Sequence, residues 1–153
     1  MIKAASDLPS AQVLPDDPSR GDTSYYNYPG VAVVTWDRTL KAVHIEWQRG
    51  TNSAYFTECL ETGLRVLTEH CGSRWLADCR NLRPIQPSEQ VWLDRSWFPR
   101  MLTAGLTRMA VVVAKSAIAK RNVEDILGRV SNTSLDVAYF ATVDEAGRWL
   151  VAW

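Results

Sequence analysis

Four polar residues follow two apolar segments of the chain, at the points where those segments end. Asp78 and Arg80 come after the residues WLA, and Lys115 and Ser116 come after the run MAVVVA. If both segments are parallel strands, their carboxyl ends meet at the edge of the sheet where open α/β proteins bind ligands. Cations and helix N-termini gathered there would suit a small anion or a phosphorylated partner. A simpler interpretation is that Asp78 only pairs with Arg80 and fixes the turn.

Three further residues extend this candidate binding site. Arg49 follows another apolar segment, and Trp92 and Trp97 belong to the predicted helix that comes after the first polar pair. Ser88 lies at the start of the same helix. It is most simply an N-cap that accepts a backbone N–H, and its phosphorylation is the less favoured alternative.

The histidines and cysteines do not form a recognisable catalytic or metal site. His44 lies in the middle of a predicted strand, and His70 is next to Cys71 in a helix, where adjacent side chains do not face each other. His44 shares a strand face with Glu46, but a metal site needs more ligands than these two. The sequence has no glycine-rich phosphate loop. Because a nucleophile also needs a base and a group that orients it, we expect a protein that is not an enzyme and uses no cofactor.

The composition restricts the class of protein. Seventeen Lys and Arg residues balance seventeen Asp and Glu residues, so we expect no nucleic-acid partner. No apolar stretch approaches the roughly 20 residues of a transmembrane helix, and the N-terminus has no apolar signal segment. The three cysteines lack the paired spacing of a zinc site and are typical of a reducing compartment. These features favour a cytoplasmic protein.

Apolar periodicity predicts one α/β domain over residues 25–153, with the element order ββαβαβαβα. The predicted strands are Val31–Trp36, Leu40–Trp47, Trp75–Cys79, Met109–Ala114 and Leu135–Ala141, and the predicted helices cover 53–71, 88–104, 122–130 and 143–153. Right-handed crossovers make strands two to five largely parallel, in a five-stranded mixed sheet with about four helices. We expect the first strand on or near one edge of the sheet and the fourth strand inside it.

Three local features refine this prediction. Pro99, inside the helix over 88–104, predicts a kink or two helices that meet near Phe98. Gly63, on the apolar face of the helix over 53–71, would let that helix lie close to the sheet. Residues 1–24 contain several prolines and little apolar content, which predicts a flexible or strap-like N-terminal arm.

The middle of the chain reads WLADCRNLRPIQPSEQVWLDRSWFPRMLTAGLTRMAVVVAKSAIAK, and residues 25–153 resemble the SpoIIAA-like, or STAS-like, family of small bacterial proteins. The likeness is strongest at Asp78 and Arg80, in the segment WFPR with the AGL after it, and in the closing DEAGRWL. The resemblance implies the fold of anti-sigma-factor antagonists and, more distantly, of CRAL-TRIO lipid-binding domains. Antagonists carry a phosphorylatable serine in the turn that reads DCRN here.

Two functions from different classes remain open. The first is a regulatory or protein-interaction module for signalling, which binds a protein partner or itself as a homodimer. Seven tryptophans and five tyrosines favour the homodimer, because exposed aromatic surface commonly marks an interface. The second, implied by the likeness to CRAL-TRIO lipid-binding domains, is a carrier or sensor of a small apolar or anionic ligand. Its cavity would be lined by Trp92, Trp97 and Phe98. A large apolar cavity would favour the second function, and a tightly packed core with an exposed aromatic patch would favour the first.

Overall fold

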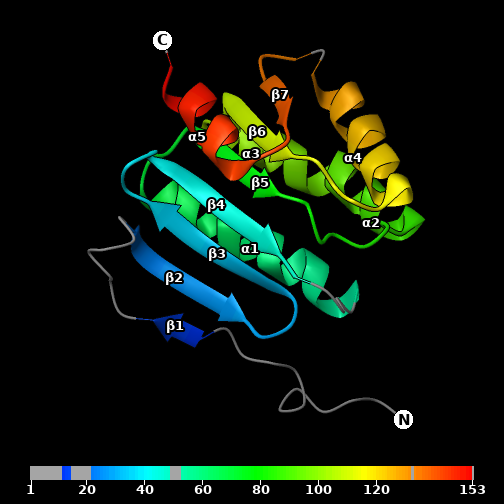
Figure 1. The fold of residues 1–153 in the computed structure, drawn as a ribbon, viewed down its shortest axis with the longest axis horizontal. Coiled ribbons are helices and arrows are strands. Elements are labelled where there is room, and N and C mark those ends of the chain that lie inside the picture. Colours follow the sequence, from blue (N-terminus) through cyan, green and yellow to red (C-terminus); the bar gives the residue numbers. More distant parts are fainter. Residues whose placement is uncertain (1–11, 15–21, 49–52, 132, 153) are drawn as a thin grey trace.

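The computed structural model describes residues 12–14, 22–48, 53–131 and 133–152, which form one β-sheet with helices on both faces (Figure 1). The elements, in chain order, are β1 (Gln12–Leu14), β2 (Asp22–Tyr28), β3 (Ala32–Asp37), β4 (Ala42–Trp47), α1 (Ser53–Glu69), β5 (Arg74–Asp78), α2 (Pro87–Trp92), η2 (Leu93–Trp97, a π-helical turn), α3 (Phe98–Ala104), β6 (Arg108–Val112), α4 (Ala117–Val130), β7 (Asp136–Phe140) and α5 (Val143–Val151).

The order of the strands in the sheet is the order of the strands in the chain, β1-β2-β3-β4-β5-β6-β7. The first four strands are antiparallel to their neighbours, and β4 to β7 are parallel. Each step from β4 to β7 moves in the same direction across the sheet. Right-handed crossovers therefore place the three connecting helical segments on one face.

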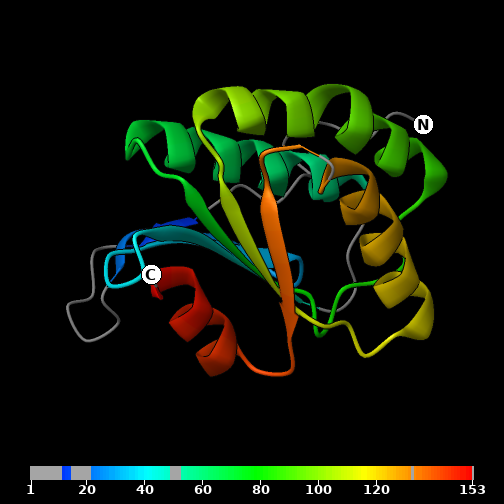
Figure 2. The same cartoon turned by 90° about the horizontal axis from the view of Figure 1, so that it is seen from above.

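Figure 2 shows these layers: α1, the continuous segment α2–η2–α3, and α4 cover one face of the sheet, and α5 lies alone on the other face. The larger apolar core fills the space between the sheet and the three helical segments. A smaller core lies between α5 and the opposite face. The predicted alternation of β4 is confirmed, because Val43, Ile45 and Trp47 belong to the larger core and Ala42 belongs to the smaller one.

The α/β class and the mixed sheet agree with the prediction, but the count of five strands is wrong. The five predicted strands are β3 to β7, and the described residues include two more, β1 and β2. Val31–Trp36 was expected on or near one edge; β2 pairs with β3, so this strand is not at the edge and lies third from it. The internal position predicted for Met109–Ala114 is confirmed, since β6 lies between β5 and β7. Residues 12–14 and 22–24, which the sequence assigned to an arm, form β1 and the start of β2.

The helical segment with Pro99 changes its geometry before the proline. The backbone N–H of Phe98 donates to the carbonyl of Leu93, five residues earlier, and α3 then begins with Pro99 in its first turn. Pro99 has no N–H to give and its ring would clash with the preceding turn of an α-helix. A π turn resolves this conflict, so the break predicted near Phe98 is confirmed in a form that the sequence did not specify.

Two predicted helix starts are wrong. The helix predicted from Ser88 begins at Pro87, its N-cap is Gln86, and the backbone N–H of Gln86 donates to Glu89 at 2.9 Å. Proline is favoured in the first turn because it has no N–H to leave unpaired, so Ser88 is an exposed residue inside the helix. The helix predicted over 122–130 begins at residue 117, where the hydroxyl of Ser116 accepts the backbone N–H of Ala119.

Candidate functional site

The first pair of predicted site residues forms a two-pronged ion pair at the carboxyl end of β5. The Nε and Nη2 atoms of Arg80 donate to the two carboxylate oxygens of Asp78, at 2.9 and 2.7 Å. The side chain of Asp78 is buried, whereas that of Arg80 is 43% exposed. Hydrogen bonding to Asp78 raises the pKa of Arg80. Asp78 thus neutralises the charge of Arg80 and holds its guanidinium in one orientation.

The structure brings the second predicted pair next to the first. The backbone N–H of Lys115 donates to the carbonyl of Arg80 at 3.2 Å, so the carboxyl ends of β5 and β6 are joined there. The Lys115 side chain is exposed. The hydroxyl of Ser116 caps α4 and therefore has a structural partner already. Whether a ligand or a partner binds at this edge stays a prediction.

The other predicted site residues are separated from this edge. Arg49 lies outside the described residues. Trp97 is buried within the larger core, and Trp92 is half-buried and packs against the outside of that core. Ser88 is exposed, in the first turn of α2.

His44 lies close to the Asp78–Arg80 pair, in the neighbouring strand. Glu46 of β4 is opposite Asp78 of β5 in the sheet, and His44 is two residues earlier on the same face. Burial lowers the pKa of His44, and the nearby carboxylates of Asp78 and Glu46 oppose this shift only in part. The Nε2 atom of His44 is buried and has no hydrogen-bond partner among the described residues. His44 is thus a neutral ring in the sheet and is poorly placed to act as a proton-transfer group.

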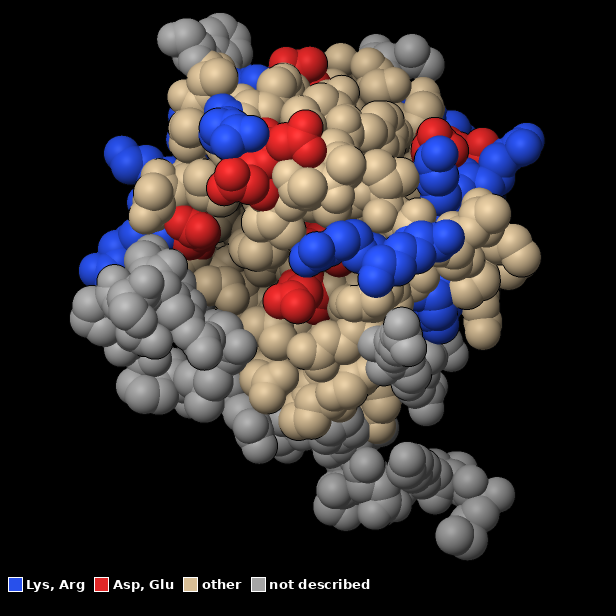
Figure 3. Space-filling model, in the orientation of Figure 1, with Lys and Arg blue, Asp and Glu red and all other residues tan. Residues whose placement is uncertain are grey.

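Acidic and basic side chains are interspersed on the face that carries α5, and apolar and uncharged surface separates them (Figure 3). The surface therefore has no large region of one charge on this side.

No group of three or more His, Cys, Asp or Glu side chains in the described ranges is arranged to hold a metal ion.

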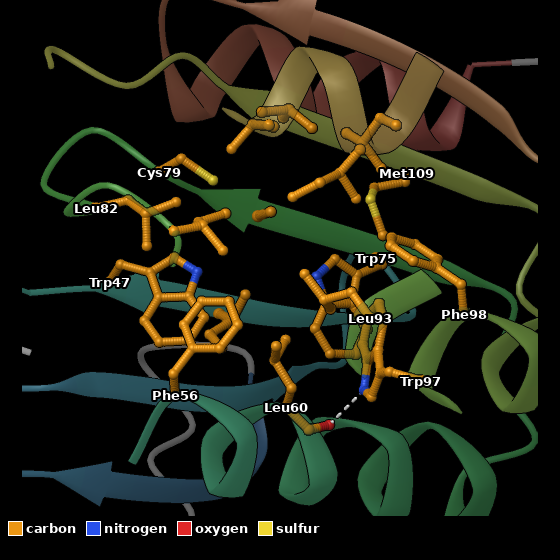
Figure 4. Close-up of a pocket in the computed structure, with 17 residues that line it drawn as sticks. Trp47, Phe56, Leu60, Trp75, Cys79, Leu82, Leu93, Trp97, Phe98 and Met109 are labelled. Atoms are coloured by element: carbon orange, nitrogen blue, oxygen red, sulfur yellow. Dashed lines mark hydrogen bonds between the residues drawn. The ribbon is translucent and has the colours of Figure 1, made fainter. Parts of the chain in front are cut away.

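A pocket of about 70 Å³ lies inside the larger core, between the central strands and the helices (Figure 4). Its walls come from β4, β5 and β6 on one side and from α1, the 79–86 loop, η2, α3 and α4 on the others. The lining residues are Ile45, Trp47, Phe56, Leu60, Trp75, Ala77, Cys79, Leu82, Ile85, Leu93, Trp97, Phe98, Met109, Val111, Val123, Ile126 and Leu127. Each of them is less than 9% exposed, so the pocket belongs to the interior of the protein.

Two groups of aromatic rings stand on opposite sides of this pocket (Figure 4). Trp47 and Phe56 are stacked, with ring centroids 5.1 Å apart and an interplanar angle of 16°. Trp97 meets Trp75 and Phe98 edge to face, at 5.2 and 4.8 Å. Edge-to-face and stacked pairs of this kind fix ring orientations, so the space between the two groups has stiff walls.

Contacts with α1 hold the second ring group in place. The indole N–H of Trp97 donates to the carbonyl of Leu60 at 2.9 Å. The ring of Trp75 lies against Gly63, and an added Cβ at that glycine would come 2.2 Å from the ring. Gly63 therefore lets α1 approach the sheet, as the sequence predicted, and the approach is made onto Trp75.

Polar contacts fix the loop over residues 79–86, which supplies Leu82 and Ile85 to the pocket wall. The guanidinium of Arg83 donates to both carboxylate oxygens of the buried Glu89, at 3.0 and 2.8 Å. The backbone N–H of Ile85 donates to the side-chain oxygen of Asn122 in α4 at 2.9 Å. This loop is thereby tied to both α2 and α4.

The thiol of Cys79 is the one titratable group in the lining. Burial raises its pKa to about 12, so the thiol is neutral at ordinary pH. Cys59 of α1, which is buried in the larger core but does not line the pocket, has a pKa raised to about 12 for the same reason. The pocket is thus an uncharged space, and these buried thiols are not activated nucleophiles.

Sequence reasoning identified only part of this pocket. It named Trp97 and Phe98 as lining residues, and both line the pocket; Trp92, which it also named, does not. The likeness to CRAL-TRIO lipid-binding domains was the reason for naming Trp97 and Phe98. No comparable reason singles out Ile45, Ala77 or Val111, which read only as strand core residues.

None of the helices in the described part of the chain has the length and apolar character needed to span a bilayer. The aromatic residues counted toward an interface differ in burial, and Tyr139 is exposed. Trp36, Trp47, Trp75 and Trp97 are buried, Trp92 and Trp149 are half-buried, and Trp153 lies outside the described residues. The tryptophans whose burial is described therefore do not support an exposed aromatic interface.

Comparison with known proteins leaves the resemblance to the SpoIIAA-like family as a prediction. No family model, no curated protein and no solved structure matches the chain. The functional argument therefore rests on the geometry of the polar edge and of the internal pocket.

Proposed function

We propose that this protein binds a small, predominantly apolar molecule in the pocket between its sheet and its helices, and that it does so without catalysing a reaction. The observation that carries the proposal is a space of about 70 Å³ inside the larger core, with apolar walls and stiff aromatic sides. Protein interiors are normally packed to the density of organic crystals. A void of this size costs stability, and an apolar ligand that fills it would recover that cost.

The size of the pocket limits the ligand. An apolar cavity of about 150 Å³ accepts benzene, and a cavity needs only about 10–15 Å³ to hold one water molecule. A pocket of about 70 Å³ suits a molecule of a few non-hydrogen atoms. A larger ligand would require part of the wall to move. The π turn η2 supplies Leu93 and Trp97 to the wall, and π turns are frequent at functional sites.

The lack of charged side chains in the pocket lining also restricts the kind of ligand. The lining has no ionised side chain, and in the 79–86 loop that supplies Leu82 and Ile85 the charge of Arg83 is paired with that of Glu89. An ionised ligand would lose its hydration without gaining a partner of opposite charge. The ligand we propose is therefore uncharged.

Xenon under pressure is a suitable first probe, because it has no polar group and reports only on accessible apolar space. We expect methyl NMR signals of Ile45, Val111 and Ile126 to shift with xenon, and those of Val112 and Leu150, on the α5 side of the sheet, to stay unchanged. Val111→Ile adds one methylene to the pocket and should weaken the effect. Val112→Ile makes the same addition at a buried neighbour on the opposite face and is the matched control. Shifts that are absent, or equal on both faces, would contradict the proposal.

The polar edge favours a second candidate function, a regulatory module that binds a partner. Arg80 presents a partly exposed guanidinium in a fixed orientation, with the exposed Lys115 beside it. Both cations would suit a phosphate group on a partner. Thermal melts with and without a phosphopeptide library, repeated on Lys115→Ala, test this candidate. Equal melting temperatures in all of these samples would leave the edge with a structural role only.

A further inference from the structure

Two of the aromatic walls turn a polar group toward the pocket. Figure 4 shows the indole nitrogens of Trp47 and Trp75 directed into the space between the two ring groups. Trp47 ends β4 and Trp75 is the second residue of β5, so both rings are fixed on the central strands of the sheet. The indole N–H of Trp97, by contrast, already donates to the carbonyl of Leu60.

Within the described part of the chain, no residue accepts a hydrogen bond from the indole N–H of Trp47 or of Trp75. The other lining residues are aliphatic or aromatic, apart from the neutral thiol of Cys79. Neither indole nitrogen is among the fully buried polar atoms without a partner, so each keeps some accessible surface. A donor that faces the pocket gains a hydrogen bond only from an acceptor that enters it. The pocket thus contains two donors and lacks a matching side-chain acceptor.

We infer that the ligand of this pocket is a small neutral carbonyl compound, whose oxygen accepts a hydrogen bond from Trp47, Trp75 or both. This inference rests on the proposed function and adds the chemical class of the ligand. A carbonyl oxygen has two lone pairs and can accept from two donors. The apolar remainder of such a molecule would contact the aliphatic walls, including Val111 and Ile126. A hydroxyl compound fits less well, because its own donor would meet no acceptor side chain.

The test compares two probes of nearly equal shape, acetone and 2-methylpropene, which differ in having C=O or C=CH₂. Both are titrated into protein labelled with ¹⁵N, and binding is followed by the signals of the tryptophan indole N–H groups. We expect acetone to bind more tightly and to shift the indole signals of Trp47 and Trp75. The signals of Trp97 and of Trp149, which lies on α5 over the opposite face, should stay in place.

Trp47→Phe and Trp75→Phe each keep an aromatic ring and remove one N–H. We expect the preference for acetone over 2-methylpropene to fall by about fivefold for each N–H that carries the contact, which is the usual net effect of one hydrogen bond. The preference is the ratio of the affinities of the two probes for one variant. A change in pocket size affects both affinities alike and therefore cancels in this ratio. Trp149→Phe is the control and should leave the preference unchanged.

The outcomes separate the inference from the proposed function. If neither xenon nor either probe enters the pocket, the proposed function fails and the inference fails with it. If 2-methylpropene binds as well as acetone, or if acetone leaves both indole signals unshifted, the pocket binds apolar molecules and only the inference is overturned. The indole shifts of the unmodified protein decide this point even if a tryptophan variant does not fold.

Discussion

Gly63 of α1 lies directly against the indole ring of Trp75 in β5, so that a Cβ atom on residue 63 would come 2.2 Å from Cη2 of that ring. Gly63→Ala must therefore push the helix or the ring away. We expect a loss of about 1–3 kcal/mol in the free energy of unfolding, which is typical of overpacking. Urea unfolding of the two proteins measures this loss.

Gly128 provides the matched control for that substitution. It lies in α4, is exposed, and an added Cβ would meet no atom within 4 Å. Gly128→Ala should raise the free energy of unfolding by about 0.5–1 kcal/mol, because alanine is the better residue inside a helix. Similar effects of the two substitutions would show that the contact between Gly63 and Trp75 is not tight.

The Asp78–Arg80 pair gives a second prediction. In Arg80→Ala the buried carboxylate of Asp78 keeps, within the described ranges, only the hydrogen bond from the backbone N–H of residue 80, at 3.3 Å. We expect a loss of about 1–2 kcal/mol of stability, because a buried charge without its partner is costly. Arg148→Ala breaks a pair with Asp144 in which both side chains are exposed, and should cost less than about 0.5 kcal/mol. Chemical unfolding at neutral pH distinguishes these outcomes, and a negligible effect of Arg80→Ala would contradict the structural role of the pair.

His44 predicts how stability depends on pH. Burial holds the pKa of His44 below 6.5 in the folded protein, so the unfolded chain takes up a proton on this residue at a higher pH than the folded protein does. The free energy of unfolding should therefore fall as the pH drops below about 6.5, the pKa of histidine in the unfolded chain. The fall caused by His44 should stop once the pH is below the pKa of His44 in the folded protein. His44→Gln should show a shallower fall between pH 7.5 and 5.5. Parallel curves for both proteins would mean that His44 is not desolvated.

The thiols differ in their expected reactivity. Cys59 and Cys79 are buried with pKa values raised to about 12, whereas Cys71 is exposed. A disulfide reagent at pH 8 should modify one thiol per chain in the native protein and all three after unfolding in guanidinium. Cys71→Ser should abolish the native reaction. Rapid modification of a second thiol would show that the core opens at that residue.

The central and C-terminal strands were predictable because their signals are local. The run MAVVVA predicts a strand covered on both faces, and β6 is such a strand. β2 was missed because its residues DTSYYNY are mostly polar and follow several prolines. Its place in the sheet depends on pairing with β3 and on Tyr28, which is buried and hydrogen-bonded to Thr62 of α1. Such contacts are not visible in the local pattern.

The start of α4 shows how a tertiary contact decides between two equally good local signals. Ser116 and Asn122 are both favourable N-cap residues. Ser116 caps the helix, and the side-chain oxygen of Asn122 instead accepts the backbone N–H of Ile85 from the 79–86 loop. Because Ile85 is distant from Asn122 in the sequence, the local pattern around residue 122 cannot show that its side chain is already engaged.

The pocket could not be predicted for a related reason. A void is a small difference between the volume that the backbone elements enclose and the volume that their side chains fill. Trp97 and Phe98 could be named because of the likeness to CRAL-TRIO lipid-binding domains. The volume that the elements enclose depends on how closely α1 approaches the sheet, at the contact between Gly63 and Trp75. The sequence does not give that distance.

The sequential strand order has a consequence for synthesis of the chain. Because every strand pairs only with its neighbours in the chain, the sheet can extend in the order in which residues leave the ribosome, with no strand inserted between two earlier ones. The pocket walls are complete only when α4 has followed β6. A nascent chain that ends before α4 would therefore leave uncovered the part of the apolar sheet face that α4 covers, and this exposed part is a surface that chaperones could bind.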